Sequence, residues 1–287
     1  LVFCSYMIHN GVKKLFMNRG NMFKLQQLKY FVPNLCTSFS LLLGLASVLQ
    51  SIDGNHELAA WMILWGVLLD KLDGTTARLL NASSEVGAQL DSFADFVSFG
   101  IAPAFLWYTY LQTSPVVHHG FLMTVCGVFV VAVAFRLARF NISEPPGSKS
   151  YFYGVPTTLL GAILSSGFIT MHKLSETSSS LFQEEYFAAV PFLLFASAFA
   201  LISSLRIPKL KIRKNLPLNI FQASNVLFAY MVAPFKMFPE VLFVQSFFYL
   251  VVGVIWAISP WRNILEADEE IENILDDETE EVLSSKM

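Results

Sequence analysis

The sequence predicts an all-α integral membrane protein with roughly eight transmembrane helices. Composition gives the first reason, because 54% of the 287 residues are hydrophobic and only 14% are charged, with a mean hydropathy of +0.54. This apolar share exceeds that of an ordinary soluble domain. The second reason is a series of long apolar runs, and the third is the one-sided distribution of Lys and Arg between those runs.

Eight runs of about 18–22 mostly apolar residues have the length that a helix needs to cross the hydrocarbon core of a bilayer. In chain order they occupy residues 31–51, 58–79, 88–110, 118–140, 152–172, 186–205, 216–235 and 241–259. The seventh run is the weakest of them, because it contains Pro217 and Pro234 and proline interrupts a helix.

These runs divide the chain into an N-terminal segment, a six-helix catalytic core, a pair of further spans and an acidic tail, at residues 1–30, 31–205, 206–262 and 263–287. The stretch 22–30 mixes apolar and basic residues, which suits either an interfacial helix or an ordinary basic flank of the first span. Residues 266–281 hold ten of the 22 acidic side chains and no Lys or Arg. We therefore expect a strongly acidic tail.

The positions of the basic residues predict the orientation of the chain. When the N-terminus is placed in the cytoplasm, seventeen of the 19 Lys and Arg residues fall on the cytoplasmic side, and only Lys173 and Lys236 fall outside. Positive residues concentrate on the cytoplasmic side of membrane proteins. The sequence therefore predicts that both termini are cytoplasmic, and we expect the protein in a bacterial cytoplasmic (inner) membrane.

Four aspartates interrupt the second and third apolar runs. Asp70 and Asp73 are three residues apart, and Asp91 and Asp95 are four apart, so each pair shares one face of its helix. The connecting loop is short, so the two helices are expected to be neighbours whose acidic faces can meet. Intramembrane acids cost several kcal/mol unless they face a polar cavity, and they normally mark a functional site.

The chemistry of these acids favours a hard divalent cation. Converging carboxylates without His or Cys nearby suit Mg²⁺, Mn²⁺ or Ca²⁺ better than zinc. Asp70 lies about nine residues before the cytoplasmic end of its helix, which is roughly 13 Å deep at ~1.5 Å per residue, so the pocket would open to the cytoplasm. Two such ions between carboxylates and a diphosphate are a general arrangement for phosphoryl transfer.

The same residues carry a resemblance to a known family. The chain contains the pattern Asp70-x2-Asp73-Gly74-x2-Ala77-Arg78-x8-Gly87-x3-Asp91-x3-Asp95. At every fixed position this pattern resembles the signature of the CDP-alcohol phosphotransferases. These are membrane enzymes that join a CDP-activated group to an alcohol and release CMP. The segments DSFADFVSFGIAPA, FRLARFN and YFYGVPTT, at residues 91–104, 135–141 and 151–158, are similar to the phosphatidylserine synthase branch. The resemblance runs from about residue 31 to residue 205.

The resemblance implies the six-helix fold of this family and a set of roles for the signature residues. Four carboxylates would hold two divalent ions, Mn²⁺ or Mg²⁺, namely Asp70, Asp73, Asp91 and Asp95. Asp95 would also act as the general base on the acceptor hydroxyl. Small or basic residues would shape the CDP pocket, namely Gly74, Ala77, Arg78 and Gly87. A structural pairing with an acid is the alternative role for Arg78.

Further polar residues have more than one interpretation each. Arg136 and Arg139 lie three apart near the cytoplasmic end of the fourth run, where they could bind a serine carboxylate, hold a lipid phosphate or anchor the helix end. Asn34 and Thr37 on the first run could reach the nucleotide, and hydrogen bonds between packed helices explain them equally well.

The resemblance implies transfer of the phosphatidyl group from CDP-diacylglycerol to L-serine by a homodimer embedded in membrane lipids, with no nucleic-acid partner. The signature alone leaves glycerol 3-phosphate or an inositol phosphate open as the acceptor. Intramembrane acids also serve ion or proton transporters. A transporter would need carboxylates along a path across the membrane, whereas these acids cluster on one side.

Overall fold

The computed structural model describes residues 19–79, 84–143, 151–177, 180–208, 224 and 227–258. These ranges are mainly helical, which confirms the predicted helical fold class but not the number of membrane spans. The principal helices are α2 (Arg19–Ile52), α3 (His56–Leu79), α4 (Glu85–Asp95), α5 (Ala102–Leu111), α6 (His119–Ser143), α7 (Thr157–Thr177), α8 (Ser180–Ile202) and α10 (Pro239–Ile258). Four short elements are also present: a π-helix η1 (Phe96–Ile101), a 3-10 turn η2 (Ala233–Phe235) and two paired strands, β1 (Tyr151–Tyr153) and β2 (Arg206–Pro208).

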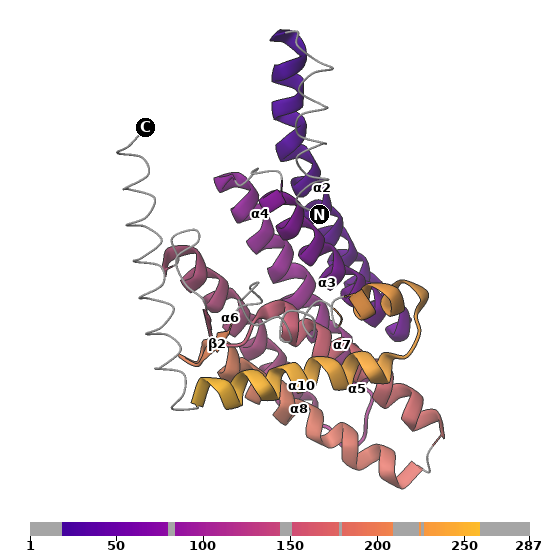
Figure 1. Cartoon of the computed structure of the whole chain (residues 1–287). Helices are drawn as coiled ribbons and strands as arrows, with labels where there is room; N and C mark the ends of the chain where they lie inside the picture. Colours follow the sequence, from indigo (N-terminus) through magenta and orange to yellow (C-terminus); the bar gives the residue numbers. More distant parts are fainter. Residues whose placement is uncertain are drawn as a thin grey trace.

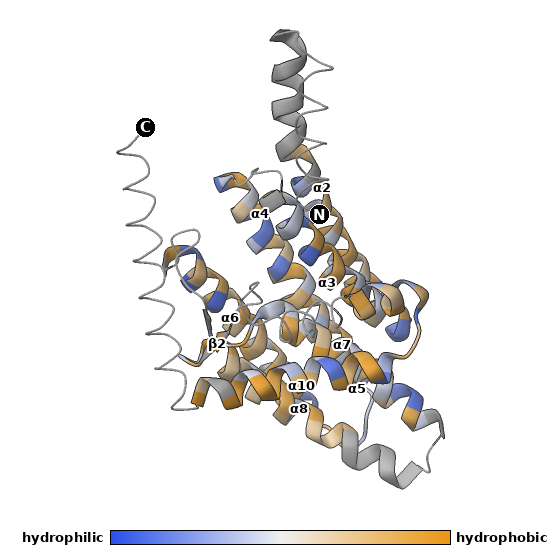
Figure 2. Cartoon of the chain, viewed as in Figure 1, coloured by the Kyte–Doolittle hydropathy of each residue, from blue (hydrophilic) through white to orange (hydrophobic). Residues whose placement is uncertain are grey.

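Helices α2, α3 and α4 form the part of the molecule that contains the four signature aspartates, which lie on α3 and α4. α2 packs along α3 and also contacts α4 and η1 (Figure 1). The remaining helices surround an apolar core whose fully buried side chains include Trp61, Leu106, Phe129 and Phe168. Apolar residues dominate α8 and α10, while polar residues gather on α4 (Figure 2). This core is the frame on which α3 and α4 are held.

Two helices in the described ranges are long and apolar enough to cross a membrane, at Pro33–Ile52 and His119–Ile142. Two shorter apolar helical stretches, at Phe187–Ile202 and Pro239–Ile255, fall below that length. Half of the predicted span 216–235 and the whole tail 263–287 lie outside the described residues. The total of eight spans therefore stays a prediction.

The first helix differs from the prediction at its N-terminal end. The apolar run predicted a span that begins at residue 31, but α2 begins at Arg19 and continues through Pro33 to Ile52. The backbone of residues 22–30 is therefore part of the same helix and does not form a separate one. Proline is tolerated inside such helices when neighbouring groups satisfy the freed backbone.

The third predicted span, 88–110, is divided by a π-helix that begins directly after Asp95. A π-turn inserts a residue into the helical repeat and is frequent at functional sites. Tertiary contacts hold this turn, because Ser98 Oγ donates a hydrogen bond of 2.8 Å to the carbonyl of Ser40 and Phe99 is fully buried. The turn is a consequence of how α4 and α5 fit against α2.

Replacing Gly44 by Ala should destabilise the protein, because Gly44 lies at the crossing of α2 and η1. An added Cβ would lie 2.7 Å from Ser98 Cα, which is backbone and cannot rotate away. Overpacking of this kind typically costs about 1–3 kcal/mol. The thermal unfolding midpoint of the detergent-solubilised protein measures the effect. Gly127→Ala on α6 is the matched control, because no atom lies within 4 Å of its added Cβ; equal midpoints for the two variants would contradict the packing argument.

The predicted span 152–172 begins later than expected, because its first residues form a strand. β1 pairs antiparallel with β2, with Phe152 opposite Ile207, and α7 starts only at Thr157. Gly154 has a φ of 74°, a left-handed conformation that glycine adopts readily, and Pro156 follows it. The Gly154 N–H donates to the Leu205 carbonyl at 2.8 Å. This turn fixes where α7 begins.

Candidate active site

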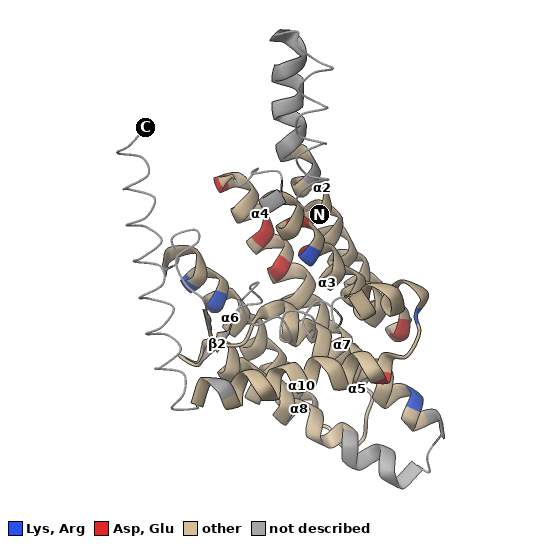
Figure 3. Cartoon of the chain, viewed as in Figure 1, with Lys and Arg blue, Asp and Glu red and all other residues tan. Residues whose placement is uncertain are grey.

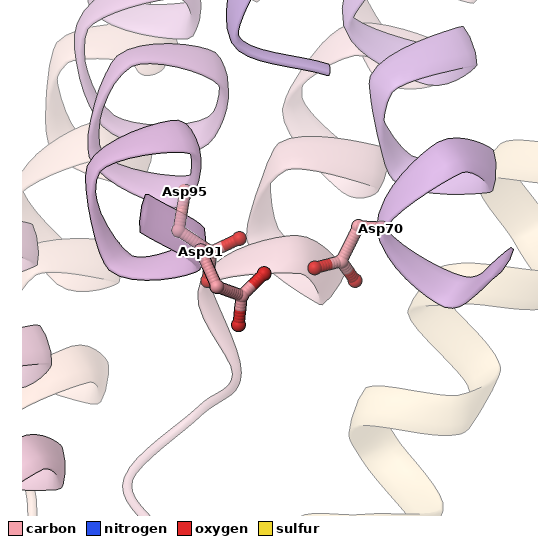
Figure 4. A group of neighbouring side chains, drawn as sticks. All are labelled: Asp70, Asp91 and Asp95. Atoms are coloured by element: carbon pink, nitrogen blue, oxygen red, sulfur yellow. The ribbon is translucent and has the colours of Figure 1, made fainter. Parts of the chain in front are cut away.

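Three aspartates from two consecutive helices converge on one point. Asp70 comes from α3, and Asp91 and Asp95 come from the last turns of α4. One carboxylate oxygen from each lies within 4.8 Å of the other two. The side chains point toward one another across the space between the two helices (Figure 4). The predicted meeting of the two acidic faces is therefore present for these three residues.

The start of α4 is fixed by its N-cap and by a close approach to α2. The Gly87 N–H donates to Ser84 Oγ at 3.0 Å, which satisfies one of the free amides of the first turn. A Cβ on Gly87 would lie 2.9 Å from both Asn34 Oδ1 and Ser84 Oγ, so a larger residue would require these side chains to shift. Gly87 and Asn34, both predicted near the nucleotide, thus form a packing contact that places α4 against α2.

Asp73 lies on the same helix as Asp70, but its carboxylate has a partner on α2. Thr37 Oγ1 donates to Asp73 Oδ2 at 2.7 Å, and the same hydroxyl lies 3.1 Å from the carbonyl oxygen of Pro33. Both side chains are buried. Thr37 therefore makes the hydrogen bond between packed helices that was one of its two interpretations, and the role of Asp73 as a metal ligand stays a prediction.

Asp95 has a partner on α7 that the sequence analysis did not identify. Thr157 Oγ1 donates to Asp95 Oδ2 at 2.8 Å, and Arg136 Nη1 lies 3.3 Å from the same Thr157 oxygen. Thr157 and Arg136 are 2% and 6% exposed, so these contacts are shielded from solvent. Arg136 is thereby connected to the acidic cluster through one hydroxyl. The sequence contains one indication that Thr157 begins a helix, because it directly follows Pro156 and proline is common at helix starts.

Arg139 is engaged with the backbone at the end of α8. Its guanidinium donates to the carbonyl oxygens of Ile202 at 2.9 Å, Ser203 at 3.2 Å and Tyr153 at 3.3 Å. Cations are favourable at a helix C-terminus, where the last carbonyls lack partners. These contacts favour the helix-anchoring interpretation of Arg139. They also hold β1 and α8 together beside the start of α7.

The surroundings of Asp70 include one cation and an open surface. Lys71 Nζ lies 3.8 Å from Asp70 Oδ2, with side chains 46% and 14% exposed, and the sequence analysis had given Lys71 no role at the site. Gly74 faces open space, since no atom lies within 4 Å of an added Cβ, and Ala77 is partly exposed. The side chain of Arg78 lies outside the described residues. Charged positions gather on α3, α4 and the end of α6 (Figure 3).

The segment that precedes α10 packs against α3 next to the acids. The Tyr230 hydroxyl donates to the Leu68 carbonyl at 2.6 Å, and Trp65 Nε1 donates to the Ala233 carbonyl at 3.0 Å. Lys236 Nζ lies 5.5 Å from the centre of the Trp65 ring, within reach of a cation–π interaction. The sequence analysis missed Tyr230, because no short-range pattern links it to α3.

The comparison with family models decides the assignment. The model of the CDP-alcohol phosphatidyltransferase family matches residues 30–202, which is more than half of the chain. The chain belongs to this family. The matched range contains the whole signature and also Arg136 and Thr157. The resemblance inferred from the aspartate signature is therefore confirmed.

Several relatives in the family are named CDP-diacylglycerol–serine O-phosphatidyltransferase. The protein from Helicobacter pylori (strain J99) is 39% identical over 128 residues, covering 44% of this chain and 52% of that protein. The Bacillus subtilis (strain 168) protein is 35% identical over 136 residues, covering 47% and 73%. The Saccharomyces cerevisiae protein is 35% identical over 166 residues, covering 53% and 58%. The chain thus spans about half the length of the Helicobacter relative that it matches.

The donor set of the cluster fits the divalent metal that the family implies. Within the described ranges, Asp70, Asp91 and Asp95 form the one group of three or more His, Cys, Asp or Glu side chains close enough to share an ion. Carboxylate oxygens are the preferred ligands of Mg²⁺, Mn²⁺ and Ca²⁺. Oxygens bound at about 2.0–2.6 Å to one ion lie at most roughly 5 Å apart. The 4.8 Å limit of this cluster meets that condition.

Proposed function

We propose that this protein transfers the phosphatidyl group of CDP-diacylglycerol to the hydroxyl of L-serine, giving phosphatidylserine and CMP. The observation that carries the proposal is the convergence of Asp70, Asp91 and Asp95 inside the range that matches the family. The serine acceptor is supported by relatives at 35–39% identity that are named for this reaction. Membership in the family supports the CDP-activated donor.

In this proposal, Asp70 and Asp91 are the principal ligands of two divalent ions, Mn²⁺ or Mg²⁺, and Asp73 and Asp95 complete the site. The Thr37 hydroxyl engages Oδ2 of Asp73, which leaves Oδ1 for ligation. When bound, the metal would neutralise the diphosphate of the CDP-lipid and absorb the charge that develops on the departing CMP. Gly74 and Ala77 leave the adjacent face of α3 open to the nucleotide.

Asp95 acts as the general base in the proposed reaction. It takes the proton from the serine hydroxyl as the serine oxygen attacks the phosphorus and the bond to the CMP oxygen breaks. The carboxylate is held for this role by Thr157 on α7. A direct displacement of this kind needs no covalent enzyme intermediate, and the group of clustered side chains in the described residues contains no His or Cys.

Arg136 is the proposed partner of the serine carboxylate. Arginine binds a carboxylate through two parallel hydrogen bonds. Burial strengthens the electrostatic attraction between the guanidinium and the carboxylate. The guanidinium of Arg136 is buried and reaches Thr157, which also contacts Asp95. A substrate bound there would carry its carboxylate beside Arg136 and its hydroxyl toward Asp95. Arg139 is less suited to this role, because its donors contact backbone carbonyls.

The location of the reaction is part of the proposal. The charge distribution supports a cytoplasmic active site in a bacterial inner membrane, with both termini in the cytoplasm. The two helices that are long and apolar enough to cross a membrane support membrane insertion. We also propose that the protein acts as a homodimer among membrane lipids, as the resemblance implies.

A competition among acceptors tests the proposed function. The full chain in detergent receives CDP-diacylglycerol and Mn²⁺ or Mg²⁺, with L-serine, glycerol 3-phosphate or inositol 1-phosphate in separate reactions. CMP release and the mass of the lipid product are measured. We expect phosphatidylserine and CMP with L-serine alone. CMP release with glycerol 3-phosphate or the inositol phosphate and none with serine would overturn the serine assignment.

A further inference from the structure

We infer that Thr157 is a positioning residue of the proposed reaction, whose single hydroxyl holds the Asp95 carboxylate and the Arg136 guanidinium in one fixed arrangement. The inference rests on the proposed function, because it concerns how the acceptor is presented at that site. Thr157 contacts both groups, at 2.8 Å and 3.3 Å, from a third helix that contributes none of the three clustered acids. Nothing in the aspartate signature requires a residue at this place.

The chemistry of the three groups fixes the direction of the hydrogen bonds. A guanidinium has only donors, so Arg136 must donate to the Thr157 oxygen. The hydroxyl has one proton, and an ionised carboxylate only accepts, so that proton is directed to Asp95 Oδ2. The chain therefore runs from Arg136 through Thr157 to Asp95. Rotation of the Asp95 carboxylate about its Cβ–Cγ bond would break the second bond.

Backbone hydrogen bonds around Thr157 restrain the position of its hydroxyl. Thr157 is the first residue of α7 and follows the turn at Gly154, whose N–H donates to Leu205. The next amide, that of Val155, donates to the Ala200 carbonyl at 3.1 Å. Arg139 clamps Tyr153 to the end of α8. The start of α7 is thus tied to α6 and α8, and Thr157 itself is 2% exposed.

The consequence concerns the acceptor rather than the donor. A substrate that carries both a carboxylate and a hydroxyl can use Arg136 and Asp95 together only if the two groups keep a constant separation. Misplacement of a reacting group by about 1 Å costs up to ~100-fold in rate. CDP-diacylglycerol binding depends on Asp70, Asp91 and the bound metal, so the loss of the Thr157 hydroxyl should leave it largely intact.

The test compares Thr157→Val, which keeps the shape but removes the hydroxyl, with Thr157→Ser, which keeps the hydroxyl. Thr170→Val is the matched control, because Thr170 lies on the same helix and its hydroxyl donates to the Ser166 carbonyl of that helix at 2.8 Å. We expect Thr157→Val to lower kcat/KM for serine by roughly 10- to 100-fold, with the KM for CDP-diacylglycerol within about twofold of wild type. Thr157→Ser and Thr170→Val should stay within about threefold of wild type.

A second readout avoids turnover altogether. Serine affinity is measured by calorimetry in the absence of CDP-diacylglycerol, and Thr157→Val should weaken it at least about fivefold while Thr157→Ser does not. The inference is overturned if Thr157→Val keeps wild-type kcat/KM and serine affinity, or if Thr157→Ser falls as far as Thr157→Val. If Thr157→Val does not fold, Thr157→Ser against Thr157→Ala gives the same comparison without a methyl group in the place of the buried hydroxyl.

Failure of the proposed function would give a different result from failure of the Thr157 inference. A wild-type chain that releases CMP only with another acceptor would refute the serine assignment, and the Thr157 comparison would then be made with that acceptor. Equal effects of Thr157→Val on the KM values of donor and acceptor would indicate a general structural role for Thr157. That result would refute the positioning role while the proposed function remained in place.

Discussion

Replacing Asp95 by Asn should lower kcat by about 100-fold or more while CDP-diacylglycerol still binds. The amide keeps the size of the side chain and can still contact the Thr157 hydroxyl, but it lacks the basic oxygen that would accept the serine proton. Losing a general base typically costs this much. Turnover is measured as CMP release, and donor binding is measured directly with Mn²⁺ present.

Asp91→Asn should behave differently, although both variants should be nearly inactive. Asp91 offers one of the three clustered oxygens, so its loss should weaken metal and nucleotide binding together. Glu85→Gln is the matched control, because Glu85 is an exposed carboxylate on the same helix outside the cluster. The assigned roles would be wrong if Asp95→Asn turned over serine at the wild-type rate. They would also be wrong if Asp95→Asn alone lost donor binding.

Removal of divalent metal should abolish CMP release completely. The acids that converge at the site are hard oxygen donors, and without a cation they would repel the diphosphate of the donor. Exhaustive EDTA treatment followed by gel filtration should leave an inactive protein, and added Mn²⁺ or Mg²⁺ should restore activity. EDTA saturated with Mg²⁺ beforehand serves as the control and should have no effect. Full activity after exhaustive chelation would refute the metal-assisted account.

The convergence of the aspartates could be predicted because it depends on local geometry. Residues three or four apart share a helix face, and a short loop makes consecutive helices neighbours, so Asp70, Asp91 and Asp95 meet as expected. The same spacing places Asp73 on the face of Asp70; its carboxylate accepts a hydrogen bond from Thr37, and its role as a metal ligand stays a prediction. Helical spacing defines a face, and it does not say which neighbouring helix that face meets.

The features that the sequence analysis missed depend on contacts between distant parts of the chain. Thr157 lies 62 residues from Asp95, and Tyr230 lies 162 residues from Leu68. The π-helix after Asp95 has no strong local signal, because packing of Ser98 and Phe99 against other helices selects it. The late start of α7 had a usable signal in Gly154 and Pro156 that the apolar run concealed.

The two arginines show how one spacing can support different roles. Arg136 and Arg139 are three apart on α6, which predicted a shared helix face and left the same three roles open for both. In the structure, Arg136 reaches Thr157 beside the acids, whereas Arg139 reaches the carbonyls at the end of α8. Arg139 finds most of its acceptors at the end of α8, with one more, the Tyr153 carbonyl, in β1.

Direct measurement of Mn²⁺ binding by electron paramagnetic resonance tests the central claim, which is that Asp70, Asp91 and Asp95 form the metal site of this protein. The wild-type protein and Glu85→Gln should bind Mn²⁺ with equal affinity, and CDP-diacylglycerol should strengthen that binding. The variant with Asn at all three positions should lose specific Mn²⁺ binding while it remains folded. Unchanged Mn²⁺ affinity in the triple variant would contradict the account, because the metal would then be held elsewhere in the protein.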